Sequence, residues 1–159
     1  MTALPSLGPR GEGWVVLQLA LLALVALAGL VGGDAWSGTP ATLTTLGGLL
    51  LMGLGALLVG KGLLDLGRNL TPVPRPRDDA ELVATGSYAT VRHPIYGGLI
   101  ATAFGWGLVS ASPPALLLAL VLAAFFELKS RREEAWLTER YADYEDYMEQ
   151  TRRFFPGLY

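Results

Sequence analysis

The residues best suited to chemistry form two short groups that are far apart in the chain. The first group consists of Arg92, His93 and Pro94, followed by Tyr96 and Gly97. Proline favours the first position of a helix and disfavours helical angles in the residue before it, so a helix is predicted to begin at Pro94 with His93 as its cap. The free N–H groups of a helix start attract anions, and Arg92 adds a positive charge with a forked donor geometry. This pattern predicts a carboxylate or phosphate receptor, with Gly97 leaving room for a bulky ligand. The competing interpretation is that Arg92 reaches lipid headgroups and His93 is an ordinary cap.

The second group is the pair Glu133 and Glu134, on a predicted helix. Steps of three and four residues from Glu133 give an apolar and aromatic stripe: Leu137, Tyr141, Tyr144 and Met148. A carboxylate at the head of such a stripe needs a partner, which is either Lys129 or the cation of a ligand. The alternative is ordinary salt bridging on a helix surface, from Lys129 to Glu133 and from Glu127 to Arg131, beside tyrosines that anchor in the headgroup layer.

The composition indicates that a membrane protein carries these groups. Of the 159 residues, 52% are hydrophobic and 16% are charged, whereas an ordinary soluble domain has about 25% charged residues. The formal net charge of −2 offers no basic excess, so no nucleic-acid partner is expected. The absence of cysteine and the single histidine exclude thiolate chemistry and a polyhistidine site within one chain, so no metal site is expected.

Four apolar runs predict an all-α, polytopic fold that forms a single membrane domain over residues 1–159. The expected transmembrane helices are residues 14–33, 43–60, 94–109 and 114–128. The first two approach the ~20 residues that cross a bilayer, and the last two are short and hairpin-like. The first run is long for the core of a cleaved signal peptide, which favours a membrane span. A cytoplasmic loop over 61–93 and an amphipathic cytoplasmic helix and tail over 129–159 complete the predicted topology.

The positive charges predict the orientation of these spans. All 12 Lys and Arg residues lie in the N-terminal tail, between residues 61 and 92, or from residue 129 onward. By the positive-inside rule, both termini and the two chemical groups face the cytoplasm. The expected location is the cell inner membrane if the source is bacterial. Glycines in the first two spans permit close helix packing and a homodimer.

Taken together, these motifs resemble the isoprenylcysteine carboxyl methyltransferase family, which is related to the membrane phospholipid methyltransferases. The resemblance covers residues 60–159 and leaves the first span outside. It is carried by Gly86-Ser87-Tyr88, by the run from Val91 to Gly98, and by Glu133-Glu134 with Leu137, Tyr144, Tyr147 and Pro156. The chain has no Gly-rich turn of the dinucleotide-binding type, so the fold of soluble methyltransferases is not expected.

The resemblance implies an integral membrane enzyme that uses S-adenosylmethionine in a pocket at the cytoplasmic face. The implied cofactor-binding residues are Arg92, His93, Pro94, Tyr96, Gly97, Glu133, Glu134, Tyr144 and Tyr147. The chemistry of these residues is consistent with this cofactor. A helix start suits its carboxylate, and a glutamate suits its ammonium or its ribose hydroxyls. Tyrosine faces can stack on adenine or stabilise the sulfonium.

The acceptor of the methyl group is expected to be a lipophilic molecule that enters from the lipid bilayer. A carboxylate acceptor, which we favour, needs no base, and either Arg92 or Arg153 would orient it. An amine or thiol acceptor needs a proton-accepting group, for which His93 or a glutamate is the candidate. The predicted catalytic residues are therefore Arg92, His93 and Arg153. The alternatives are a phospholipid amine N-methyltransferase, a small-thiol S-methyltransferase and an inactive membrane scaffold.

Overall fold

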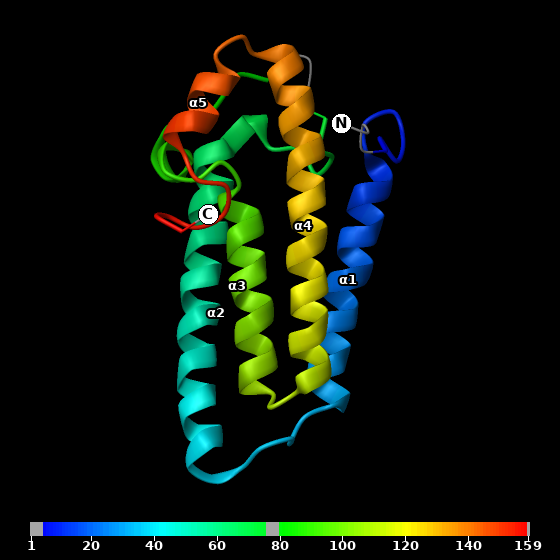
Figure 1. Ribbon diagram of the computed structural model, residues 1–159, viewed down its shortest axis with the longest axis vertical. Coiled ribbons are helices and arrows are strands. Elements are labelled where there is room, and N and C mark those ends of the chain that lie inside the picture. Colours follow the sequence, from blue (N-terminus) through cyan, green and yellow to red (C-terminus); the bar gives the residue numbers. More distant parts are fainter. Residues whose placement is uncertain (1–4, 76–79, 159) are drawn as a thin grey trace.

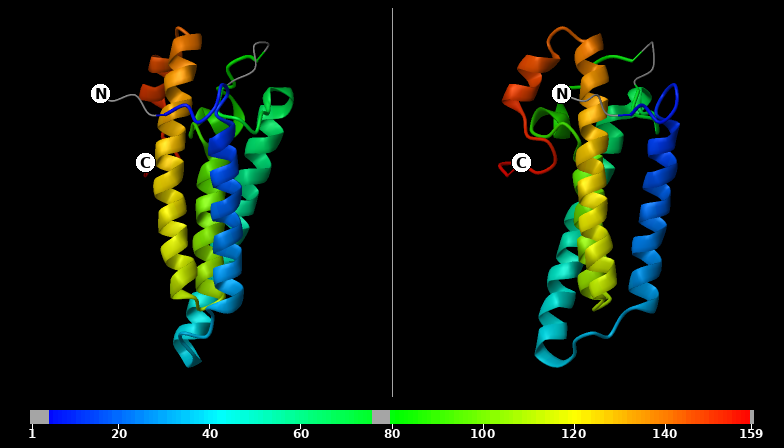
Figure 2. Two further views of the ribbon diagram at one scale, coloured as in Figure 1. Left: turned by 90° about the vertical axis from the view of Figure 1, so that its right-hand side faces the viewer. Right: turned by 45° about the vertical axis from the view of Figure 1, so that its right-hand side comes forward.

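The computed structural model describes residues 5–75 and 80–158, and within them all regular secondary structure is helical. The helices are α1 (Glu12–Val31), α2 (Gly38–Leu66), α3 (Pro94–Val109), α4 (Pro113–Arg140) and α5 (Tyr144–Gln150), with short 3-10 turns η1 (Gly67–Asn69) and η2 (Gly86–Ala89). The four long helices run side by side, and α5 and the C-terminal tail lie at the end where α1 begins (Figures 1 and 2). Residues 76–79 of the predicted cytoplasmic loop lie outside the described residues.

The long helices have the length and the surface of membrane-spanning segments. Three of them, α1, α2 and α4, are long and apolar enough to cross a bilayer, whereas α3 has 16 residues. Large apolar side chains point outward along α1 and α2, as shown by Leu30 at 72% exposure and Leu64 at 82%. Such a continuous apolar surface is typical of contact with lipid. The fold therefore fits a multi-pass membrane protein.

Helix boundaries agree with the sequence where a local signal marks them. The third helix begins at Pro94 and ends at Val109, as predicted, with His93 at its cap. The second helix is longer than the predicted span of 43–60 at both ends, since it begins at Gly38 and continues to Leu66 before Gly67 turns the chain with a φ of 49°. Residues 61–66 are therefore helical and not part of a loop.

The fourth apolar run, residues 114–128, is the first part of a longer helix that continues into the predicted cytoplasmic segment. Helix α4 runs unbroken for 28 residues, because neither glycine nor proline interrupts it after its first turn. It ends at Arg140, so the predicted stripe from Glu133 to Met148 does not lie on one helix. Its last two members, Tyr144 and Met148, belong to α5.

Glycines bring α2 and α3 into close contact. The buried residues of α2 are Gly48, Gly55 and Gly62, spaced by seven residues on one face. A methyl group added at Gly48 or Gly55 would lie 2.6 Å from a backbone carbonyl oxygen of α3. This approach confirms close packing through small residues at these two positions. Two other glycines of the second span, Gly47 and Gly53, face open space.

The C-terminal tail is held against the start of α3 by backbone hydrogen bonds. Arg92 N donates to Arg152 O at 2.8 Å, and His93 N donates to Arg153 O at 2.9 Å. The N–H of Arg152 donates in return to the carbonyl of Thr90 at 3.0 Å. The tail thereby fixes the residues that precede α3, where the first chemical group lies.

Candidate active site

A cavity of about 360 Å³ lies where the ends of the four long helices meet α5. This volume falls in the range of roughly 300–1,000 Å³ that is usual for small-molecule sites. Its polar and aromatic lining consists of Gln18, Asn69, Thr71, Glu81, Tyr88, Arg92, His93, Tyr96, Lys129, Glu133, Tyr141, Tyr144 and Tyr147. Six of the nine predicted cofactor-binding residues are among them. The structure therefore brings the two chemical groups of the sequence together in one wall.

Glu134 is the centre of a buried ionic network beside this cavity. Its Oε1 accepts a hydrogen bond from Arg92 Nε at 2.8 Å, and its Oε2 accepts one from Arg153 Nη2 at 2.8 Å. His93 Nε2 lies 3.2 Å from Oε1. Glu134 is only 5% exposed, and a carboxylate buried to this degree needs such partners. The network joins α4 to the start of α3 and to the tail.

The two predicted catalytic arginines are both engaged with protein groups. Arg92 donates from Nη1 to the carbonyl oxygens of Met148 at 2.9 Å and Thr151 at 2.6 Å, which holds the end of α5. Its Nη2 has no acceptor among the described residues. Arg153 bridges the carboxylates of Glu134 and Glu127. Burial of Arg153 lowers its pKa, but these two acids outweigh that effect, so its pKa is raised. Arg153 therefore fastens the tail to α4.

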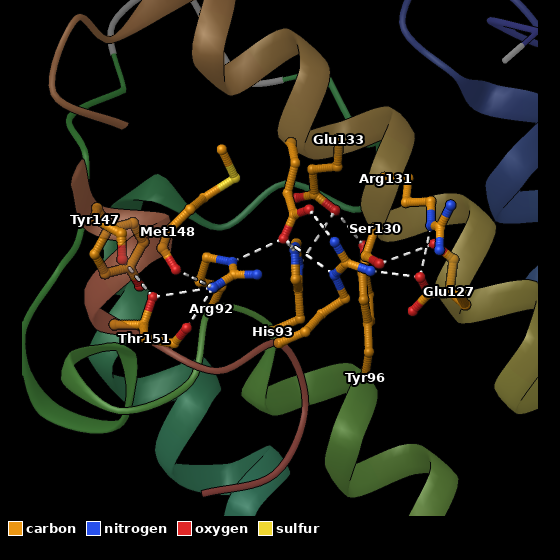
Figure 3. A network of polar contacts seen from close by, with 12 residues as sticks. Arg92, His93, Tyr96, Glu127, Ser130, Arg131, Glu133, Tyr147, Met148 and Thr151 are labelled. Carbon is orange, nitrogen blue, oxygen red and sulfur yellow. Dashed lines mark hydrogen bonds and ion pairs between the residues drawn. The ribbon is translucent and has the colours of Figure 1, made fainter. Parts of the chain in front are cut away.

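Glu133 differs from its neighbour because it faces the cavity. Its Oε2 accepts a hydrogen bond from the hydroxyl of Tyr96 at 2.7 Å, and His93 Nδ1 lies 3.9 Å from the same oxygen. The rings of His93 and Tyr96 stack with centroids 5.3 Å apart and planes 3° apart. Figure 3 shows these three side chains converging from α3 and α4. A carboxylate, an imidazole and a phenol thus form one polar wall.

Tyrosines from α5 form a second wall. Tyr144 is 1% exposed, and Tyr147 donates its hydroxyl to the carbonyl of Tyr88 at 2.6 Å. Burial raises the pKa of Tyr147 to about 12, and burial together with nearby glutamates raises the pKa of Tyr144 as well. Both rings are therefore neutral in the physiological range and can stack on a flat or cationic ligand.

Lys129 and Gln18 line the cavity at a place that the sequence analysis did not identify as a site. Lys129 is 1% exposed, donates a hydrogen bond to Gln18 Oε1 and lies with Nζ 4.9 Å from the ring centre of Tyr96. The predicted ion pair with Glu133 is absent, because no carboxylate of the described residues comes within 4 Å of Nζ. The pair from Glu127 to Arg131 does form, at 2.6 Å. The sequence signal that could have identified Gln18 is its position as a polar residue within the first apolar run, residues 14–33.

Pro94 and Gly97 have packing contacts instead of a place in the cavity lining. The face of Gly97 that lacks a side chain is covered by the backbone carbonyl of Phe154, and Pro94 packs against Gly62 of α2. This corrects the expectation that Gly97 leaves room for a ligand. Its small size positions the tail.

Comparisons with known proteins relate this chain to a family of membrane proteins. A family model described as phospholipid methyltransferase matches residues 43–144, which include both chemical groups. The nickel-cobalt-cadmium resistance protein NccN of Alcaligenes xylosoxydans xylosoxydans is 31% identical over 149 residues, which are 91% of this chain and 62% of that protein. The chain thus spans less than two thirds of this relative.

Within the described ranges, no three His, Asp or Glu side chains form a group that could hold a metal ion.

Proposed function

Because the chain belongs to the phospholipid methyltransferase family, which includes isoprenylcysteine carboxyl methyltransferase-like members, we propose that it is an S-adenosylmethionine-dependent membrane methyltransferase. Its acceptor is a lipophilic molecule, and the favoured reaction is O-methylation of a carboxylate. The observation that carries this proposal is the shared cavity wall, in which His93 from the start of α3 meets Glu133 from α4 at 3.9 Å.

The groups in the cavity fit this cofactor. Its carboxylate suits Arg92 Nη2 and the start of α3, since both attract anions. Its ammonium suits Glu133, which is the carboxylate that faces the cavity. Its adenine and its sulfonium suit the faces of Tyr144 and Tyr147, where a cation–π contact contributes ~0.5–2 kcal/mol.

Bound S-adenosylmethionine supplies a methyl group that is already activated by its sulfonium. The residues of the chain bind and orient the two reactants, which can lower a barrier by roughly 7–11 kcal/mol. The buried tyrosines and the tail exclude water from the site. A carboxylate acceptor carries its own nucleophilic oxygen, so His93 needs no proton-transfer role. Its contact with Glu134 and its stacking on Tyr96 make it a positioning and cofactor-binding residue.

The four long helices are proposed to cross the membrane, with the cavity at the cytoplasmic side of the cell inner membrane. The distribution of Lys and Arg supports this orientation, since the loops at the far end carry none. Helix α3 spans about 24 Å, which fits a locally thinned bilayer. The apolar lining residues Leu63, Leu66 and Ile95 give a lipophilic acceptor a route into the cavity. The exposed glycines of α2 remain the predicted surface of a homodimer.

Binding of S-adenosylhomocysteine to the detergent-purified protein tests the cofactor site. Calorimetry should show binding to the wild type and a loss of about tenfold or more in affinity for His93→Ala and Glu133→Gln, because each removes a charged or polar contact. Glu139→Gln, an exposed change on the same helix, is the matched control and should bind normally. Equal affinity in all variants would contradict the assignment, and no binding to the wild type would favour an inactive scaffold.

The nature of the methylated product tests the acceptor class. Purified protein is incubated with a lipid extract and S-adenosylmethionine labelled in its methyl group. Mild alkali should release the label as methanol, because it hydrolyses a methyl ester. An alkali-stable label in the phospholipid fraction would instead identify amine methylation, and a stable label on a thioether would identify thiol methylation.

A further inference from the structure

We infer that Lys129, positioned by Gln18 of α1, binds the carboxylate of the acceptor, an inference that rests on the proposed methyl transfer. The family match begins at residue 43, so Gln18 lies outside it. The first helix would then contribute to substrate specificity as well as to membrane anchoring.

The ammonium group of Lys129 is buried, and a buried positive charge is stabilised by an anion close to it. An ammonium group has three donors, and among the described residues Gln18 Oε1 is the hydrogen-bond acceptor at Nζ. A neutral amide, the face of Tyr96 at 4.9 Å and the more distant charge of Glu133, which forms no ion pair with Lys129, compensate a buried positive charge only in part. Because Lys129 is 1% exposed and yet lines the cavity, an anionic ligand in the cavity would be the close ionic partner that it lacks among the described residues.

The position of Lys129 separates an acceptor region from the proposed cofactor region. Lys129 precedes Glu133 by one turn of α4, so it lies about 6 Å further toward the middle of the bundle. The ring of Tyr96 lies between, with its hydroxyl on Glu133 and the Lys129 ammonium over its face. A lipid carboxylate at Lys129 would therefore have its chain in the apolar part of the cavity and its oxygens near the cofactor.

The other cations of the site have protein partners. Arg153 bridges Glu127 and Glu134, and Arg92 donates to Glu134 and to two carbonyls of the α5 end. From the sequence alone, one of these two arginines is expected to orient an acceptor carboxylate. The structure favours Lys129, which has no ion pair with any described residue.

The reaction balances without a proton transfer. One carboxylate oxygen of the acceptor forms a bond to the methyl carbon while the bond from that carbon to sulfur breaks, and the electron pair of the broken bond stays on sulfur. The sulfonium becomes a neutral thioether, and the carboxylate becomes a neutral methyl ester. Since the ester has lost the charge that Lys129 attracts, the product binds more weakly than the acceptor.

Lysine-selective labelling tests the inference, because the chain has only two lysines, Lys61 and Lys129. The protein is labelled with ¹³C at the lysine ε-carbon and saturated with S-adenosylhomocysteine in a nonionic detergent. It should give two resonances, and the variant Lys61→Met shows which of them belongs to Lys129. Added oleate should shift the Lys129 resonance saturably and leave the exposed Lys61 unchanged. Oleyl alcohol, which has the same chain and no charge, should leave both unchanged. An equal response to the alcohol, no response to oleate, or a response only to oleyl phosphate would overturn the inference.

Variants then test the side chain itself, with oleate ¹³C-labelled at its carboxyl group as the probe. Lys129→Met should weaken oleate binding about tenfold, whereas Lys129→Arg should retain most of it and the control Lys61→Met all of it. Gln18→Leu should weaken binding less than Lys129→Met does. Calorimetry of S-adenosylhomocysteine on the same samples reports folding and separates the two proposals. Normal cofactor binding with unchanged oleate binding in Lys129→Met refutes only the role of Lys129, and no cofactor binding in the wild type refutes the proposed function.

Discussion

Glu133 and Glu134 are neighbours in the chain but have different surroundings. The apolar stripe predicts Glu133 on the buried side of its helix, whereas the structure buries Glu134 more deeply. The reason is the tail, which folds back and places Arg153 beside Glu134. Adjacent helical residues point about 100° apart, so one acid joins the protein interior and the other faces the cavity. The sequence identified the pair but not this division.

Replacing Glu134 by Gln should destabilise the protein strongly. The change removes the shared partner of Arg92 and Arg153 and leaves buried positive charge, which typically costs about 3–5 kcal/mol. Chemical unfolding in detergent, followed by circular dichroism, measures this cost. Glu133→Gln should have a smaller effect, because Glu133 is more exposed and has no arginine partner among the described residues. Equal stability of the two variants would refute the structural role of Glu134.

Tyr147 should make stability depend on pH in the alkaline range. Burial raises its pKa from 10.0 to about 12 in the folded protein. The folded state therefore keeps its proton when the unfolded state loses it, so the stabilisation is complete below pH 10 and declines as the pH rises toward 12. Thermal unfolding across this range should show the decline, and Tyr147→Phe should make it shallower. An identical slope in the variant would show that Tyr147 does not contribute.

At the scale of elements, local sequence signals predict where helices begin. The same signals do not predict the contacts between residues that are far apart in the chain. Pro94 marks the start of α3 because its ring geometry acts within two residues. The charges after residue 126 end the apolar run but not the helix, because polarity alone does not interrupt backbone hydrogen bonding, and α4 ends only at Arg140. The contacts of Arg92 with Glu134 and of Lys129 with Gln18 join residues 42 and 111 positions apart, and no periodicity encodes such distances.

The packing of α2 on α3 can be tested with two glycines of the same helix. Gly55→Leu should destabilise the protein by about 1–3 kcal/mol or more, because its side chain would meet the backbone of α3. Gly53→Leu should leave stability nearly unchanged, since nothing lies within 4 Å of that position. Unfolding midpoints in detergent compare the two. A similar loss in both would mean that α2 packs on another face.

At the scale of the whole molecule, the apolar bundle carries its polar chemistry at one end only. Helix α5 and the tail lie at the end where α1 begins and α4 finishes (Figure 2), and the cavity is lined by residues of that end. The connections at the opposite end, residues 32–37 and 110–112, carry no Lys or Arg. The charge pattern of the sequence was sufficient to predict this asymmetry, because it depends on the order of segments and not on their contacts.

Single cysteines can test the orientation of the bundle, because the natural chain has none. Ser37→Cys, between α1 and α2, should react with a membrane-impermeant maleimide from outside the cell. Glu149→Cys, an exposed position in α5, should react only after the membrane is opened or inverted. Labelling of both positions from one side would refute the proposed four-span topology.

The carboxylate at position 134 has a consequence for how such a chain can change over generations. Two guanidinium groups, one before α3 and one in the tail, share this acid, and only the one in the tail has a second carboxylate partner, Glu127. Losing the acid alone leaves Arg92 without a carboxylate partner and Arg153 with one partner instead of two. Losing either arginine alone leaves the buried acid with less compensating charge. Descendants that abandon this arrangement should therefore exchange all three positions as a set, because each intermediate with one replacement would fold poorly.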